Sequence, residues 1–399
     1  MQEKAGAPAI RFAGFAGDWE QHKLSKITTM HARIGWQNLR TSEFLDSGDY
    51  MLITGTDFED GVINYDTCHY VARERYEQDK HIQVSNGSIL ITKDGTLGKV
   101  AYIQGLSIPA TLNAGVFNVE IKNKNEVDNK YLYQYLKAPF LMDYVDKKAT
   151  GGTIKHLNQN ILVDFPVNMP VKAEQQAIGQ FFEHLDHLII LHQNKYSQLC
   201  NVKKSMLEKM FPKEGTTVPE IRFAAFTGDW EQCKAKELCS ISTGKSNTQD
   251  RVDEGIYPFY VRSPIVERSN RYLFDEEAVL TVGDGVGTGK VFHYVNGKYD
   301  LHQRVYRMFD FSDGITAKYF YYYFSNHFFN RVMSMTAKTS VDSVRYEMIA
   351  EMEIALPKVQ EQKAISAFFD SLDNLITLHQ HKLDRLQNIR KACLEKMFI

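Results

Sequence analysis

The sequence has no apolar run of about 18 residues, so no segment is expected to span a bilayer. Residues 1–8 are polar and lack the apolar core of a signal peptide, which leads us to expect a cytoplasmic protein. The five cysteines form no Cys-x-x-Cys and have no histidines at zinc spacing, so we expect free thiols and no metal. The net charge of −2 is unlike that of a nonspecific nucleic-acid coat protein. A DNA-binding face would therefore have to concentrate positive charge, or a partner would have to supply it.

Familiar catalytic motifs are also missing. We find no dinucleotide-binding glycine motif, no methyltransferase tetrapeptide of the Asn-Pro-Pro-Tyr type, no zinc-protease motif and no nucleophile elbow. Residues 283–290 (GDGVGTGK) superficially resemble a phosphate-binding loop. However, Asp284 stands where the first glycine belongs, and Val291 stands where Ser or Thr is required. An active site assembled from scattered carboxylates remains an alternative that sequence cannot reveal.

What the sequence does contain is an internal repeat. Residues 8–24 return at 219–235 with 12 of 17 positions identical, displaced by 211. Residues 170–211 return at 357–398 with 23 of 42 positions identical, displaced by 187. The chain is therefore a tandem duplication, in which constant segments flank divergent inserts.

The two displacements differ by 24, so the second insert is shorter than the first. We interpret the inserts as recognition modules, and structural domains that have drifted apart are the alternative. The expected fold class is α+β, with two mixed α/β domains and two long helices in an antiparallel coiled coil related by a pseudo-twofold repeat. The expected boundaries are 1–169 (first target-recognition domain), 170–213 (first long helix), 214–356 (second target-recognition domain) and 357–399 (second long helix).

Each long helix of about 38 residues, roughly 57 Å at 1.5 Å per residue, carries a heptad seam. Since one helix cannot bury such a seam alone, we predict that the two seams pair; packing of each seam on its own module is the alternative. His192 and His379 occupy matching positions, where a polar core residue is favoured over a ligand. The seams comprise Ile178, Phe182, Leu185, Ile189, His192, Tyr196, Leu199, Lys203, Met206 and Met210, and Ile365, Phe369, Leu372, Ile376, His379, Leu383, Leu386, Arg390, Cys393 and Met397.

The inserts share a pattern of strands followed by a helix, which predicts a common fold. In the first, strands are expected at 50–54, 88–92, 99–103 and 116–121, and a helix at 130–141. In the second, strands are expected at 278–282, 290–294 and 304–309, and a helix at 317–329. Matching glycine-rich turns lie at 93–99 and 283–290, between two of the strands.

Residues able to contact DNA are expected at these turns, at the basic, hydroxyl-rich stretches after each helix, and in residues 33–40 (RIGWQNLR), which bring two arginines and two amides near an aromatic. Lysine and backbone amides suit phosphate contacts, whereas arginine and amide side chains can pair with base edges. For any single stretch, an ordinary hairpin or a solvated face is the alternative. The candidates are Arg33, Gln37, Asn38, Arg40, Lys93, Thr96, Lys99, Lys147, Lys148, Thr150, Thr153 and Lys155 in the first insert, and Lys245, Asn247, Thr288, Lys290, Arg304, Lys338, Thr339, Ser340 and Arg345 in the second.

Taken together and in order, the constant segments closely resemble the specificity subunit of type I restriction-modification systems. The resemblance covers essentially the whole chain. It rests on residues 152–157 (GTIKHL), 165–170 (FPVNMP), Glu174-Gln175 leading into Ile178 and Phe181-Phe182, Leu185-Asp186, residues 191–193 (LHQ), and the two Gly-Asp-Trp-Glu-Gln segments.

The resemblance implies that each domain reads one half of a bipartite, asymmetric DNA site through the major groove. It implies that the helices fix the gap between the halves and dock two methyltransferase subunits, while restriction subunits translocate and cleave DNA. No cofactor is then expected on this chain; S-adenosylmethionine, ATP and Mg²⁺ belong to the partners. Independently of the resemblance, helices tens of Å long are suited to hold two DNA-binding domains about one DNA turn, ~34 Å, apart. A nuclease with a cryptic site and a coiled-coil scaffold that does not bind DNA are the rival functions.

Overall fold

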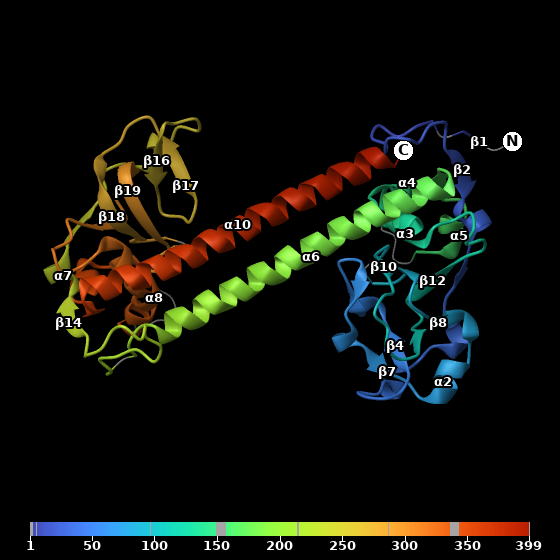
Figure 1. The fold of residues 1–399 in the computed structure, drawn as a ribbon, viewed down its shortest axis with the longest axis horizontal. Coiled ribbons are helices and arrows are strands. Elements are labelled where there is room, and N and C mark those ends of the chain that lie inside the picture. Colours follow the sequence, from blue (N-terminus) through green and yellow to red (C-terminus); the bar gives the residue numbers. More distant parts are fainter. Residues whose placement is uncertain are drawn as a thin grey trace. The chain divides into compact units, whose positions relative to one another are not determined.

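The computed structural model describes residues 3–4, 6–95, 97–148, 157–213, 215–285, 287–335 and 343–398. These residues divide into two compact units, the first formed by 1–192 with 382–399 and the second by 193–381 (Figure 1). Each unit holds one mixed α/β domain together with one half of each long helix. Within the described ranges, none of the helices has the length and apolarity needed to cross a membrane.

The main sheet of the first domain is four-stranded and antiparallel, in the order β10-β9-β12-β3. Strand β9 is buried at every position, because the sheet is covered on both faces. Helix α3 packs against the sheet through Tyr131, Leu132 and Leu136 within one apolar core. The elements are β3 (Thr28–His31), β9 (Ile89–Thr92), β10 (Val100–Tyr102), β12 (Val116–Ile121), α3 (Asn129–Lys137), α4 (Phe140–Lys148) and α5 (Gln159–Val163).

A second small sheet, in the order β7-β4-β11-β8, has its own apolar core in this domain. It accounts for much of the extra length of the first insert, since most of its elements lie between β3 and β9. Its neighbourhood comprises η1 (Gly35–Gln37), η2 (Thr41–Glu43), β4 (Met51–Ile53), η3 (Gly55–Asp57), β5 (Phe58–Glu59), β6 (Val62–Ile63), η4 (Tyr65–Thr67), β7 (His69–Tyr70), α2 (Arg73–Glu77), η5 (Lys80–Ile82), β8 (Gln83–Val84) and β11 (Ala110–Leu112).

The second domain carries one six-stranded sheet, in the order β15-β20-β18-β19-β16-β17. Its long strand β19 pairs with both β18 and β16. In the first domain the corresponding path is divided between β10 and β11, with a loop between them. The elements are β15 (Ser240–Thr243), η6 (Thr248–Asp250), β16 (Tyr257–Tyr260), β17 (Val266–Ser269), β18 (Phe274–Val282), β19 (Phe292–Leu301), β20 (Val305–Phe309), α8 (Ala317–Ser334) and α9 (Tyr346–Ala350).

The segments at the ends of each insert pair with each other. Strand β2 lies between β1 and β13 in the first unit, and β14 pairs with β21 in the second. Each pair closes its domain where the constant segments meet. The elements are β1 (Glu3–Lys4), β2 (Glu20–Lys23), α1 (Leu24–Ile27) and β13 (Pro166–Met169), and β14 (Glu231–Lys234), α7 (Ala235–Leu238) and β21 (Glu353–Leu356).

Helices α6 (Lys172–Lys209) and α10 (Val359–Met397) are continuous, and within each unit their halves run antiparallel. In the first unit Asp186 of α6 pairs with Arg390 of α10 at 2.5 Å. In the second unit the same pair recurs with the roles exchanged, Lys203 of α6 against Asp373 of α10. Because these residues match at a displacement of 187, the register of the two helices has the predicted pseudo-twofold repeat.

The predicted seams lie on the inner side of each helix pair. Ile178, Phe182, Leu185 and Leu199 are buried, and so are Ile365, Phe369 and Leu372; Ile189, His192, Ile376, His379 and Leu386 are partly buried. The two alternatives for the seams were pairing of the helices and packing of each helix on its own domain, and the structure combines them. Phe182 lies in the core of its own domain and also stacks on Phe398, which follows the end of α10. The matching stack in the second unit joins Phe369 and Phe211.

Four element predictions were wrong by several residues at one end. The strand predicted at 278–282 begins at Phe274, and the helix predicted at 317–329 continues to Ser334. The helix predicted at 130–141 ends at Lys137, because Ala138 precedes Pro139 and a residue before proline avoids helical dihedrals. A second helix, α4, then starts at Phe140. The strand predicted at 290–294 begins at Phe292 and continues to Leu301, because the turn before it extends through Lys290.

Candidate nucleic-acid interface

One set of backbone hydrogen bonds recurs at the same edge of both main sheets. In the first domain Lys93 N donates to Gly115 O and Leu157 N donates to Lys93 O, each at 2.8 Å. In the second, Gly283 N donates to Arg304 O at 2.8 Å and Val344 N donates to Gly283 O at 2.7 Å. The two edges are therefore built on one frame, and their residues can be matched position by position.

We call this edge the loop edge of each domain. Loops that follow or precede the sheet strands meet there, which places side chains from distant parts of the chain next to one another. The loop edge consists of the described residues of 34–40, 54–57, 93–99, 113–115 and 157–158 in the first domain, and of 245–250, 261–265, 283–290, 302–304 and 343–345 in the second.

Two arginines flank an aspartate at the second loop edge. Nη1 of Arg262 lies 3.5 Å from Oδ1 of Asp284, and Nε of Arg304 lies 3.7 Å from Oδ2 of the same carboxylate. The arginine side chains are 49% and 65% exposed. A shared carboxylate restricts both guanidinium groups while leaving most of their donors free to meet a ligand.

A buried polar network lies beneath these arginines. Oγ of Ser246 donates to Oδ1 of the fully buried Asp300 at 2.6 Å, and Arg271 donates to the same Oγ at 3.1 Å. Nδ1 of His302 accepts from Arg304 N at 3.0 Å. Burial lowers the pKa of His302, and Arg262 adds to that shift, so the ring stays neutral at pH 7 and keeps this acceptor. The network fixes the backbone from which Arg304 projects.

Other predicted residues join the second loop edge. Asn247 is exposed and its Oδ1 accepts from Nε2 of Gln303 at 2.6 Å, which makes a pair of amides beside the arginines. Lys245, Lys290 and Arg345 are exposed as well. The structure thus brings Lys245, Asn247, Lys290, Arg304 and Arg345 to one edge of the sheet.

The first loop edge carries different side chains on the same frame. Gly115 stands at the position of Arg304, and Gly55 at that of Arg262, because Ile53 O and Tyr260 O accept the matching bonds from Asn113 and His302. Asn38, Arg40 and Lys99 are exposed, while Lys93 is partly buried with Nζ 5.6 Å from the centre of the Phe117 ring. Lys147 and Lys148 are exposed at the end of α4. Arginine side chains are therefore replaced by glycine at two matched positions.

Arg33 corrects one of the sequence predictions. It was expected to contact DNA, but it is 1% exposed and Nε donates to Leu112 O at 3.0 Å. Burial lowers the pKa of its guanidinium, and the charge of Arg75 acts in the same direction. At the matching place in the second domain, the backbone N–H groups of Lys245 and Ser246 donate to Leu301 O. Arg33 therefore has a structural role, supplying donors that the second domain takes from its backbone.

Two further candidates are buried. Gln37 is 5% exposed next to Arg33. Thr288 is 5% exposed, because its Oγ1 donates to Gly285 O inside the turn. In this conformation neither side chain is available to DNA, and the residue type gave no sign of this. Thr96, Thr150, Thr153, Lys155, Lys338, Thr339 and Ser340 lie outside the described residues.

The sequence prediction missed Arg262, Asp284 as an orienting group, Arg271 and Gln303. Arg262 lies in Val-Arg-Ser-Pro, directly after a strand that was not predicted. Gln303 directly precedes Arg304, which was selected. Recognising that the candidate strands end at one sheet edge would have favoured all residues just beyond those ends.

The two repeats of this chain also match known proteins. The model of the family described as type I restriction modification DNA specificity domain matches residues 17–201 and 227–388. The chain belongs to this family. It is similar to the type I restriction enzyme MjaVIII specificity subunit of Methanocaldococcus jannaschii, with 26% identity over 343 residues and 79% of each chain covered. The MjaX specificity subunit of the same organism is 22% identical over 407 residues, covering 94% of this chain and 92% of the relative.

The fold is likewise that of a type I specificity subunit. A crystal structure of the S subunit of a type I restriction-modification system from M. genitalium superposes with a TM-score of 0.73 at 16% identity. The superposition covers 98% of this chain and 99% of the other. Both domains and both long helices are therefore part of the family architecture.

Proposed function

We propose that this specificity subunit reads a bipartite DNA sequence, one half through the loop edge of each domain, without catalysis of its own. The observation that carries the proposal is the shared backbone frame with different exposed side chains at matched positions. A common frame presents both domains to a duplex in the same way, while different side chains read different bases.

The second loop edge has the chemistry for direct readout. Arg262 and Arg304 can each pair with the O6 and N7 atoms of guanine, and the amides of Asn247 and Gln303 can pair with adenine. Lys245, Lys290 and Arg345 then contact phosphates. At the first loop edge Asn38, Arg40, Lys93 and Lys99 take these parts, together with Lys147 and Lys148. The two half-sites therefore differ in sequence.

Exposed apolar residues on the helices support docking of two methyltransferase subunits. In the first unit Leu188, Leu191 and Ile389 are 40%, 53% and 38% exposed. In the second unit Leu375, Leu378 and Val202 are 43%, 46% and 43% exposed. Each trio is the repeat of the other at a displacement of 187, so the chain offers one apolar surface twice. Two copies of one partner fit this duplication.

The methyltransferase copies would hold S-adenosylmethionine, and restriction subunits would use ATP and Mg²⁺. We expect Leu191→Asp or Leu378→Asp to lose one methyltransferase copy and the double variant to lose both. Native mass spectrometry of the reconstituted complex measures this directly. Loss of both copies from either single variant would contradict two independent docking surfaces.

The decisive experiment maps adenine methylation across the genome of the host. Deleting the gene should abolish methylation at one bipartite motif, and exchanging residues 9–165 for another insert should change one half of that motif only. A change in both halves would contradict independent reading. Cleavage or modification of DNA by the purified chain, with or without metal, would support the rival nuclease, whereas an unchanged methylome would support the scaffold.

We further propose that α6 and α10 set the number of base pairs between the half-sites. A heptad inserted into each helix adds about 10.5 Å, close to three base pairs. The methylated motif should then keep both halves and gain about three base pairs between them. Retention of the original spacing would contradict this assignment.

A further inference from the structure

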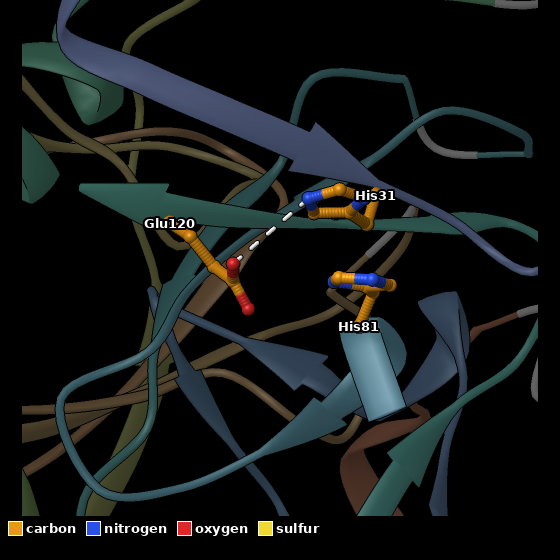
Figure 2. A group of neighbouring side chains, drawn as sticks. All are labelled: His31, His81 and Glu120. Atoms are coloured by element: carbon orange, nitrogen blue, oxygen red, sulfur yellow. Dashed lines mark ion pairs between the residues drawn. The ribbon is translucent and has the colours of Figure 1, made fainter. Parts of the chain in front are cut away.

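Three side chains that can bind a metal converge on the sheet of the first domain, apart from the loop edge. They are His31 at the end of β3, His81 in η5 and Glu120 in β12 (Figure 2). One ligand atom from each lies within 4.8 Å of the other two, and Nε2 of His31 is 3.9 Å from Oε2 of Glu120. They lie far apart in the sequence, so no spacing motif announces them.

The strand register explains the meeting of His31 and Glu120. His31 pairs with Asn118 across two antiparallel strands, so Glu120 is its diagonal neighbour on the same face of the sheet. The side chain of Asn118 is buried, and Nδ2 donates to Glu120 Oε1 at 3.1 Å and to His81 O at 3.0 Å. One amide therefore fixes both the carboxylate and the turn that carries His81.

The two imidazole rings stack with centroids 4.5 Å apart and an angle of 20° between their planes (Figure 2). The lone pairs of nearly parallel rings do not converge, so binding requires one ring to turn. His81 is exposed and lies on a short 3₁₀ helix, which leaves it room to do so. Its backbone is already held by the bond from His81 N to Asp79 Oδ1 at 2.9 Å.

We propose that His31, His81 and Glu120 bind a divalent transition-metal ion of the zinc class. Two imidazole nitrogens and one carboxylate oxygen are the protein ligands of open zinc sites, in which water takes the fourth position. A nitrogen and oxygen ligand set also accepts Co²⁺ and Ni²⁺, whereas Mg²⁺ favours oxygen alone. The carboxylate is held by Asn118 in the way that outer residues commonly orient metal ligands.

Among the described residues, the second domain does not repeat this group of ligands. The second domain has Ser242 and Arg307 at the positions of His31 and Asn118, and Phe309 at that of Glu120. Arg307 places its guanidinium over the rings of Phe274 and Phe309 and pairs with Glu276, so this corner is filled by a cation. The proposed metal site is therefore specific to the first domain and does not follow from the backbone frame that the two domains share.

Metal titration of the purified full-length chain tests the proposal. After treatment with a chelator, the chain should bind one Co²⁺ with a visible absorption spectrum typical of nitrogen and oxygen ligands, and Zn²⁺ should displace it. His81→Ala and Glu120→Gln should each lower the affinity by at least about 100-fold, since loss of an outer residue alone costs up to that much. Zn²⁺ should also raise the melting temperature of the wild-type chain and not that of His81→Ala.

His69→Ala is the matched control, because His69 is another exposed histidine of the same domain, next to Phe44. Its affinity for Co²⁺ should equal that of the wild type. Circular dichroism shows whether each variant is folded. Unchanged affinity in folded His81→Ala, equal loss in His69→Ala, or a thiolate-to-cobalt band indicating cysteine ligands would overturn the proposal.

Discussion

The two domains are alike where the backbone closes the sheet edge and unlike in the side chains that the edge presents. The bonds that join residues 93, 115 and 157 recur among residues 283, 304 and 344. Yet glycine stands in the first domain at the two positions where the second presents Arg262 and Arg304. A reader of this kind can change its target without changing its fold, because the frame depends on backbone groups and the target depends on side chains.

Matched substitutions in the constant segments should destabilise both domains by similar amounts. Arg11 meets the buried carboxylate of Glu174 through two bonds of 2.6 and 2.7 Å, and Arg222 meets Glu361 through two bonds of 2.7 Å. Removing either arginine leaves a buried charge without its partner. We expect Arg11→Ala and Arg222→Ala each to lower the free energy of unfolding by about 3–5 kcal/mol. Denaturant titration, followed by a probe in each domain, measures both losses.

Arg11→Lys and Arg222→Lys provide the matched controls. They keep the charge but lose the two-pronged geometry, so each should cost less than the corresponding alanine variant. A large loss in one domain with none in the other would break the equivalence of the constant segments.

The next test concerns a carbonyl that has a different donor in each domain. Leu112 O accepts from the side chain of Arg33, whereas the matching Leu301 O accepts from backbone N–H groups. We expect Arg33→Met to lower the free energy of unfolding by about 1–3 kcal/mol, because Leu112 O loses a buried donor. In the second domain Gly244→Ala should also destabilise, since the new Cβ would lie 2.1 Å from Leu301 O. Lys99→Met alters an exposed cation and should stay within about 0.5 kcal/mol. A wild-type stability for Arg33→Met, with weakened DNA binding, would restore Arg33 as a DNA contact.

The difference in side chains leads to a prediction about affinity. Arg262→Ala and Arg304→Ala should each weaken binding to the target duplex by about 1–3 kcal/mol and relax the preference in one half-site only. Fluorescence anisotropy of the complex with its methyltransferase, on duplexes altered in either half, measures both effects. Lys358→Ala removes an exposed cation outside the loop edge and should leave affinity unchanged. Relaxation of the other half-site would show that the domains do not read separately.

Much of this architecture could be predicted from the sequence because it repeats. The heptad pattern predicted helices of about 38 residues, and α6 and α10 have 38 and 39. The strand at 116–121 was predicted to the residue, since four of its six residues are apolar and are either β-branched or aromatic. Repetition made these signals stronger, because two divergent copies kept the same constraint.

The remainder depends on contacts that one residue type cannot reveal. Arg33 and Arg40 look alike in sequence, yet only Arg33 meets a carbonyl that lacks a backbone donor. His31, His81 and Glu120 come together through strand register and a turn, which leave no fixed spacing. In the small sheet of the first domain only β4 was predicted, because strands of two or three residues carry too short a pattern.

The smallest expected effect comes from transplanting the arginines. A Cβ at Gly55 or Gly115 would make only ordinary contacts, the nearest at 3.5 and 3.6 Å, so Gly55→Arg with Gly115→Arg should fold. If both new cations reach phosphates, the slope of log affinity against log salt steepens by up to about 1.8 on nonspecific DNA. Gln104→Arg with Asn125→Arg adds the same charge beyond the opposite ends of β10 and β12, where both residues are exposed. An equal change of slope in this control would mean that charge alone, and not its place at the loop edge, governs contact with DNA.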